Sequence, residues 1–381
     1  MVDQLRWVWQ QPDWPAWRWD AAGLSADLAL ARRAQGEALG RTQLLSPDLD
    51  VAAQAEILLA EGLATSAIEG EQLDVQALRR SIARRLGVTL ETATPPAPAG
   101  DAVEGLVDVL QDATDNWQQD LTLERLNAWQ AALFPTGRSG LHEIRMGQLR
   151  GPEPMRIVSG PLHRERVYFE APPRKGLERE LRRLIEWFNG PSRQLDGVVR
   201  AGLAHLWFEV LHPYEDGNGR VGRALLDMAL AQDAGRAMRV YSVSAQLNSV
   251  RGDYYAALEI ASRGSLDASA WLGFFVRQVQ SAAKASEVAV GKVLDKARFW
   301  MMHGGTSMND RQRKAVNRLL DCGRGGFEGG MTNSKYQRLT GASPATAQRD
   351  LAELARISVL TPLGAGRTAR YEIAWTEPSA D

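Results

Sequence analysis

One short segment of the sequence combines residue types that could act together on a phosphate-containing substrate. It reads Leu211-His212-Pro213-Tyr214-Glu215-Asp216-Gly217-Asn218-Gly219-Arg220-Val221-Gly222-Arg223. His212 can remove a proton near neutral pH, and Asp216 is a hard oxygen ligand of the kind that holds Mg²⁺ beside phosphates. Arg220 and Arg223 are three residues apart, so on a helix both guanidinium groups can reach one anion. The segment therefore offers a general base, a metal ligand and an anion site.

Two helices are expected to position this segment. An apolar helix over 197–211 should end at His212, because proline follows. Gly217 and Gly219 allow a turn whose N–H groups point one way, and a second helix from about residue 219 completes a nest for an anion. An isolated His-Pro or Asp-Gly-Asn-Gly is usually only structural. The joint pattern between two helices favours a functional loop.

The segment resembles the signature of the Fic family, His-x-Phe-x-Asp/Glu-Gly-Asn-Gly-Arg-x-x-Arg, with Tyr214 in place of the usual Phe. Family members transfer the AMP moiety of ATP to a Ser, Thr or Tyr hydroxyl of a protein, and some transfer other phosphate-containing groups. The resemblance implies that His212 is the general base and that Asp216 holds Mg²⁺. It also implies that the nucleotide phosphates are bound by Gly217, Asn218, Gly219 and Arg220, and the γ-phosphate by Arg223.

A second motif lies at residues 65–70. Thr65 and Glu69 are four residues apart and share a helix face, and Gly70 is a natural helix terminator. Alone, this common string usually marks a solvated or capping Glu. It resembles the inhibitory helix of the Fic family, which implies that Glu69 pairs with Arg223, occupies the space of the γ-phosphate and holds ATP in an unreactive pose.

Two further stretches agree with the resemblance. Residues 166–173 resemble the family's flap, a short hairpin ending in Pro-Pro, whose strand edge would hold a target segment by backbone pairing. A plain surface hairpin is the alternative. Residues 253–258 resemble the helix whose first Tyr borders the nucleotide base. Tyr254 would fill that place, and a role as a core aromatic is the other interpretation.

The chain as a whole is expected to be mainly α-helical. Apolar residues recur at helical spacing in 51–64, 101–117, 122–134, 177–189, 197–211, 221–233 and 253–262. Strand-like alternation is confined to 154–158, 166–170 and 370–375. The fold expected is a Fic-type helical bundle with a short β-hairpin flap, followed by a winged helix. We place an N-terminal Trp-rich region with the inhibitory helix at 1–95, the catalytic domain at 100–290 and a winged-helix-like domain at 305–381.

Both ends of the chain have a distinct composition. Five of the 12 Trp lie in the first 20 residues, with Pro12 and Pro15 between them, and we expect them to staple the N-terminus onto the helical body. Binding of a peptide, base or sugar is the alternative. Between 305 and 373 a modest basic excess accompanies a helix-turn-helix pattern. Thr346, Gln348, Arg349, Arg367 and Arg370 could reach DNA, although a protein-interaction or structural role is favoured.

Composition limits the remaining classes. The chain has 381 residues, a formal net charge of −1 and a single cysteine, which excludes a basic nucleic-acid coat and a disulfide framework. Without a signal peptide or an apolar run of spanning length, we expect a cytoplasmic protein with no membrane contact. A homodimer is compatible with the sequence.

The leading hypothesis is a self-inhibited protein adenylyltransferase that uses ATP and Mg²⁺ to modify a protein hydroxyl, including its own. The alternative from another class is a winged-helix DNA-binding regulator whose Fic domain senses nucleotide. Within the enzyme class, removal of AMP or transfer of another nucleotide is the alternative.

Overall fold

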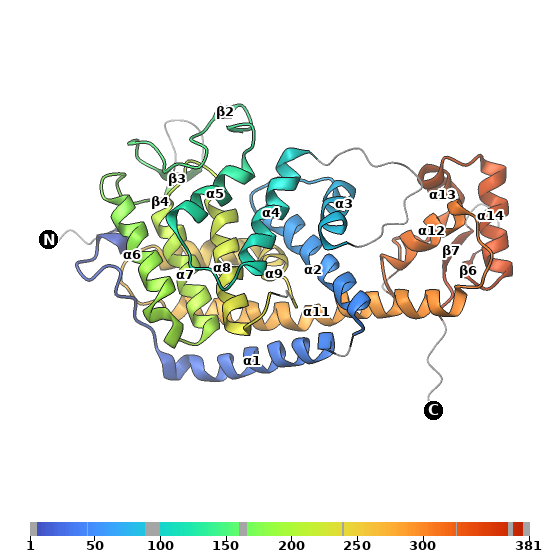
Figure 1. The fold of residues 1–381 in the computed structure, drawn as a ribbon, viewed down its shortest axis with the longest axis horizontal. Coiled ribbons are helices and arrows are strands. Elements are labelled where there is room, and N and C mark those ends of the chain that lie inside the picture. The colour runs from blue at the N-terminus through green and yellow to red at the C-terminus, as the bar shows by residue number, and fades with distance from the viewer. Residues whose placement is uncertain are drawn as a thin grey trace. The chain divides into compact units, whose positions relative to one another are not determined.

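The structure is a computed structural model that describes residues 6–43, 45–87, 100–159, 166–237, 240–324, 326–364 and 369–375. It is mainly helical with few, short strands (Figure 1), which confirms the predicted class. The helices are α1 Ala21–Gln43, α2 Pro47–Ile68, α3 Val75–Leu86, α4 Asp101–Asp115, α5 Leu123–Leu133, α6 Leu177–Asn189, α7 Gly197–Leu211, α8 Asn218–Ala234, α9 Val243–Ser249, α10 Arg251–Ala261, α11 Ser269–His303, α12 Asp310–Leu320, α13 Asn333–Thr340 and α14 Pro344–Arg356. The strands are β1 Arg138–Ser139, β2 His142–Glu143, β3 Arg156–Ser159, β4 Arg166–Glu170, β5 Met331–Thr332, β6 Leu360–Leu363 and β7 Arg370–Ile373.

The chain divides into two compact units. The first draws on residues 1–43, 54–87 and 98–286, and the second on 44–53 and 287–381. The sequence predicts three parts, with a separate N-terminal region at residues 1–95. In the structure most of that region shares one unit with the expected catalytic domain. The predicted Pro/Ala linker at 94–100 lies outside the described residues, apart from Gly100.

Helices α7 and α8 form the centre of the first unit and pack against each other (Figure 1). α7 is buried on nearly every face, so its sequence is a continuous apolar run without a polar stripe. Glycine permits the close approach, because a Cβ atom at Gly222 would lie 2.6 Å from Oε1 of Glu209. α4 packs against α8, and α6 against α7. The loop between α7 and α8 is thus held at one end of a buried helix pair.

Strands β3 and β4 form the predicted hairpin. They pair antiparallel, with Ile157 opposite Phe169 and a register shift between Ile157 and Val158. The side chains of Ile157 and Val158 are 45% and 44% exposed, so β3 presents apolar side chains to solvent.

The N-terminal segment packs onto this hairpin, as expected of a staple. Trp7 is buried and packs edge-on against Phe169, with 5.4 Å between the ring centroids. The indole N–H of Trp9 donates to the carbonyl of Glu170 at 2.8 Å. Arg6 donates to the carbonyl of Val167 at 3.2 Å. The Trp-rich segment therefore fixes β4 from outside the hairpin.

Helix α2 is long and apolar enough to cross a membrane when judged by length and composition alone, which the sequence analysis did not expect. Within the fold, 56% of its apolar stretch is buried. Ile57 and Ile68 are 2% and 0% exposed and belong to the core. Packing inside the protein accounts for the apolar character of this helix.

The second unit has its own core, with Val316, Tyr336 and Leu351 fully buried. Its antiparallel sheet has the strand order β5-β7-β6. α13 ends at Gly341, whose φ is +73°, and the Ser343 side chain caps α14. These elements follow the expected helix-turn-helix pattern, and the winged-helix interpretation stays a prediction. Arg367 lies outside the described residues.

Candidate active site

His212 ends α7 in a left-handed backbone conformation, with φ +45° and ψ 59°. Among the described residues, only His212 and Ser358 combine a positive φ with a side chain. Such conformations cost free energy and persist where the surroundings hold them, which happens often at functional sites. His212 therefore stands at a sharp change of chain direction, where its imidazole leaves the helix axis.

Arg150 is the side chain that holds this turn. Its Nε donates to the His212 carbonyl at 2.9 Å and its backbone N–H donates to the Pro213 carbonyl at 2.9 Å. Its Nη2 donates to the carbonyl of Pro172, at the base of the hairpin. Burial and the nearby Arg174 lower the pKa of Arg150 to about 10. It is thus a charged clamp between the loop and the flap, and no local pattern in the sequence marks it.

Asn218 closes the loop from inside. Its side chain accepts from the Tyr214 N–H at 2.9 Å and donates to the Tyr214 carbonyl at 2.8 Å. The Tyr214 ring is fully buried, and its hydroxyl donates to Asn127 at 3.0 Å. Tyr214 is therefore the expected core anchor, and its extra hydroxyl has a partner. Because the Asn218 side chain is occupied, a phosphate at this loop would meet its backbone N–H.

The turn into α8 has the geometry of an anion nest. Gly217 has φ +86° and precedes the first residue of the helix, so the free N–H groups of the first turn face one side. A Cβ atom at Gly219 would lie 2.1 Å from Oε1 of Glu69. The Glu69 carboxylate therefore lies against this first turn, where the helix dipole favours negative charge.

Arg223 is the most buried charged group at the loop. It is 1% exposed, and its Nη2 forms an ion pair of 2.7 Å with Oε1 of Glu69. Thr65 holds the same guanidinium twice, through its hydroxyl at 2.7 Å and its carbonyl at 2.9 Å. The contact expected between Glu69 and Arg223 is present in the structure.

Arg220 has an acidic partner that the sequence analysis missed. Its Nη1 forms an ion pair of 2.8 Å with Oε2 of Glu71, and its guanidinium lies 4.9 Å from the centre of the Phe134 ring. Both arginines of the loop are thus paired with carboxylates from one short segment after α2. Glu71 had no motif to mark it, because it stands outside the Thr65-x-x-x-Glu69 spacing.

Charges and burial set the protonation states at the loop. Burial alone would raise the pKa of Glu69. The charge and hydrogen bond of Arg223, together with the smaller effect of the Arg220 charge, lower this pKa below its usual value. Burial lowers the pKa of His212 to about 4. At neutral pH Glu69 is therefore ionised, and His212 is a neutral imidazole that can accept a proton.

Asp216 could hold a metal only together with other ligands. Its Oδ1 accepts from the Gly217 N–H at 2.6 Å, and its Oδ2 accepts from the hydroxyl of Ser139. Within the described ranges there is no cluster of three or more acidic, His or Cys side chains that could hold a metal. Mg²⁺ in nucleotide sites commonly takes one or two carboxylates and completes its shell with phosphate and water. One half-buried carboxylate beside an anion nest fits that mode and does not fit a metal site made of protein ligands alone.

Tyr254 is buried in the structure, and its place beside the nucleotide base stays a prediction. Its ring is 1% exposed, and its hydroxyl is 2.7 Å from Nε2 of the buried His205. Its burial agrees with the alternative interpretation, a core aromatic, because α10 turns this face inward. The neighbouring Tyr255 is 43% exposed, and its hydroxyl donates to the Ile68 carbonyl at 2.7 Å. Tyr255 is thus a solvent-exposed aromatic side chain bonded to Ile68, the residue before Glu69.

Glu209 was also missed. It precedes His212 by three residues on α7, and its Oε1 is buried without a hydrogen-bond partner in the described part of the chain. Burial raises its pKa to about 8, so it is mostly neutral at pH 7. It adds a protonated carboxyl behind Arg223, and only the packing of α7 on α8 could have revealed it.

Comparisons with known proteins agree with this geometry. Residues 120–230 match the Fic/DOC family, and residues 7–88 match a domain of unknown function (DUF4172). The protein adenylyltransferase fic-1 of Caenorhabditis elegans is 32% identical over 108 residues, which is 28% of this chain and 19% of the relative. The probable protein adenylyltransferase aq_aa38 of Aquifex aeolicus is 37% identical over 65 residues, 17% of this chain and 20% of the relative. The chain thus matches about a fifth of the length of these curated relatives.

Solved structures share the fold. A Fic family protein from Desulfovibrio desulfuricans G20 aligns with a TM-score of 0.50 and 19% identity, over 92% of this chain and 97% of that one. A Fic-domain-containing signaling protein from Bacteroides thetaiotaomicron aligns with a TM-score of 0.52 and 15% identity, over 70% and 97%. The region matched to the Fic/DOC family contains α7, the loop that follows it and most of α8. Residues 120–230 are therefore similar to the Fic/DOC family, and the loop at residues 212–223 lies within that match.

Proposed function

We propose that this protein transfers AMP from ATP to a hydroxyl group of a protein, and that the structure is its self-inhibited form. One observation carries the proposal: a neutral imidazole, an anion nest and two arginines meet at one loop, and a carboxylate already occupies the nest. Relatives of the matched region are named protein adenylyltransferases, which supports the reaction class.

His212 is proposed as the general base. Its Nε2 would take the proton of the incoming hydroxyl while the hydroxyl oxygen attacks the α-phosphorus of ATP. The bond from that phosphorus to the bridging oxygen then breaks, and pyrophosphate leaves. The backbone of Glu209 raises the pKa of the imidazole against the larger effect of burial, which lowers it. Nδ1 is buried without a hydrogen-bond partner among the described residues. A positioned base of this kind contributes on the order of 10²–10⁴-fold.

The nest and the arginines would hold the triphosphate. Such transfers depend on positioning and on neutralising charge more than on covalent help from the protein. The backbone of Gly217, Asn218 and Gly219 would take the α- and β-phosphates, with Arg220 beside them, and Arg223 would take the γ-phosphate. Asp216, near Ser139, would hold Mg²⁺, which when bound neutralises phosphate charge.

The self-inhibition is proposed to come from the ion pair between Glu69 and Arg223, which we call the brake. Its carboxylate lies against Gly219 in the nest and repels a phosphate there, while it satisfies the guanidinium that the phosphate needs. Glu71 adds to the brake by pairing with Arg220. ATP can then bind only with its phosphates displaced from the positions that the reaction requires.

The test uses mass spectrometry of the Glu69→Gly variant after incubation with Mg-ATP, alone and with cell lysate. We expect an added AMP on the protein or on a lysate protein, and none with a Glu69→Gly, His212→Ala double variant. Specific DNA retention by the protein, together with no labelling, would instead favour a nucleotide-sensing regulator. Loss of AMP from a modified protein would point to the reverse reaction.

A further inference from the structure

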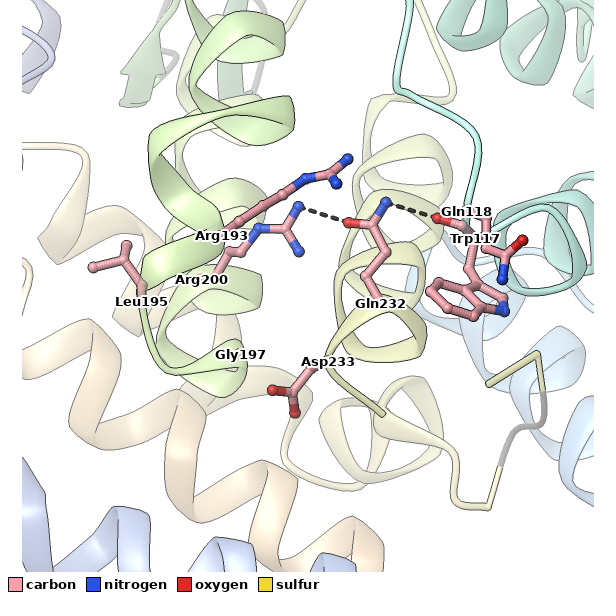
Figure 2. A pocket seen from close by; sticks show the side chains of 8 residues that line it. All are labelled: Trp117, Gln118, Arg193, Leu195, Gly197, Arg200, Gln232 and Asp233. Carbon is pink, nitrogen blue, oxygen red and sulfur yellow. Dashed lines mark hydrogen bonds between the residues drawn. The ribbon is translucent and has the colours of Figure 1, made fainter. Parts of the chain in front are cut away.

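A cavity of about 400 Å³ lies at the end of α7 and α8 remote from the catalytic loop (Figure 2). Its walls come from the first turn of α7, the last turn of α8, and the segments that precede α5 and α7. α7 has 15 residues, and at about 1.5 Å per residue the cavity is roughly 20 Å from His212. No residue discussed for the proposed reaction lines it.

Arg200 forms the buried wall of this cavity. It is 3% exposed, and its guanidinium has no carboxylate partner among the described residues. Nε donates to Ser192 at 2.9 Å, and Nη2 donates to the Phe188 carbonyl at 2.8 Å and to Gln232 at 2.6 Å. These bonds leave Nη1 free among the described residues. Buried arginines are almost always paired with an acid, so this arrangement is unusual.

A second cation faces the same space. Arg193 lines the cavity beside Arg200 (Figure 2). Burial, together with the charge of Arg193, lowers the pKa of Arg200 to about 10. Arg193 has an acidic partner, Asp120, at 3.0 Å, but this pair is at the surface with half of the Arg193 side chain exposed. Such surface pairs are weak, so the Arg193 guanidinium can turn to a ligand.

The one acid in the cavity wall is already engaged. Asp233 forms an ion pair with Arg32, which also pairs with Asp196 at 2.9 Å. Its Oδ1 accepts a further bond from Arg32 at 2.9 Å. Asp233 raises the pKa of Arg200 only as the smallest of the contributions to it. The positive charge of the two cavity arginines is therefore not balanced from within the wall.

We propose that this cavity binds a small oxyanion, of phosphate or carboxylate type, between Arg200 and Arg193. A guanidinium with a free N–H edge in a recessed, partly desolvated space suits a charge-assisted bond to such an anion. The side-chain amide of Gln232 is oriented by both walls, because it accepts from Arg200 and donates to the Trp117 carbonyl at 2.8 Å. This site is separate from the nest at Gly217 and does not rest on the proposed reaction.

Titration calorimetry tests the proposal with inorganic phosphate as the first probe, and with citrate and AMP in parallel arms. The self-inhibited protein is suited to it, because Glu69 and Glu71 occupy the arginines of the catalytic loop. We expect saturable binding, weakened at least tenfold by Arg193→Gln and by Arg200→Lys. Arg182→Gln, which removes an exposed arginine of α6 that pairs with Glu178 and does not line the cavity, is the matched control and should bind as the unaltered protein does.

The three arms separate the sources of the anion. Binding of phosphate and not citrate indicates inorganic phosphate, binding of citrate indicates a carboxylate, and tighter binding of AMP indicates a nucleotide phosphate. Absence of saturable binding in all arms overturns the proposal. The proposal is also overturned if Arg193→Gln changes the dissociation constant by less than twofold. Arg193 is half-exposed, so its variant remains informative if Arg200→Lys fails to fold, which circular dichroism will show.

Discussion

Removal of the Glu69 carboxylate is the perturbation that bears most directly on the proposed brake. In Glu69→Gly, the buried Arg223 loses its carboxylate partner and keeps its two hydrogen bonds to Thr65. Removing one partner of a fully buried ion pair costs about 3–5 kcal/mol. The Glu69 side chain is 29% exposed, and Thr65 remains, so we expect the free energy of unfolding to fall by about 1–3 kcal/mol.

The same change should raise the rate of AMP transfer. A preorganised donor to developing negative charge is worth about 2.7–4 kcal/mol in the transition state. Freeing Arg223 for the γ-phosphate would then raise the rate on the order of 10²–10³-fold. Stability and activity therefore move in opposite directions in a single variant.

Two matched variants isolate the cause. Glu69→Gln keeps the shape of the side chain and removes its charge. Its rate of AMP transfer should therefore lie between that of the unaltered protein and that of Glu69→Gly. Glu56→Gln removes a carboxylate from α2, the helix that precedes Glu69. Glu56 pairs with Arg79, so this variant should leave the rate unchanged. Initial rates with labelled ATP and unfolding curves with and without Mg-ATP provide the readouts. A folded Glu69→Gly protein with an unchanged or lower rate would refute the reasoning.

Other expected outcomes follow from the same geometry. Glu71→Ala should raise AMP transfer several-fold at most, because the Glu71 side chain is 44% exposed and its pair is correspondingly weak; an effect as large as that of Glu69→Gly would contradict this ranking. In the Glu69→Gly background, kcat/KM should stay constant as the pH falls below the ordinary His pKa of about 6.5, and should decrease only near the His212 pKa of about 4, because a lowered pKa keeps the base neutral. A decrease centred at about pH 6.5 would show that burial does not lower the pKa of His212. Arg150→Met should lower kcat more than it changes KM, because the His212 turn loses its clamp, and an unchanged kcat would exclude a positioning role.

Local sequence signals predicted the elements around the site well. α6 and α7 have the predicted bounds. Apolar spacing marks α6, and Asp196 caps α7 through the N–H groups of Val198 and Val199. The loop was recognised because its glycines, its proline and its arginines have roles that follow from their own chemistry.

Other features depend on contacts that no local pattern reveals. α1 was missed because its buried face consists largely of alanines at 31, 34 and 38, which give a weak apolar signal. The bonds of Arg150 to His212 and of Glu71 to Arg220 join residues 62 and 149 positions apart. Tyr254 and Tyr255 are adjacent aromatics, and only the packing of α10 decides which of them is buried.

The attachment of the N-terminal segment to β4 has a practical consequence for dissecting the chain. An expression fragment limited to the family match at 120–230 would omit Trp7 and Trp9, which grip the hairpin, as well as both acids that neutralise the loop arginines. It would expose the face of Phe169 that Trp7 covers, and it would leave Arg220 and Arg223 buried without their carboxylate partners. Such a fragment should aggregate on purification, whereas one that begins ahead of Arg6 and extends through residue 286 keeps the catalytic unit intact.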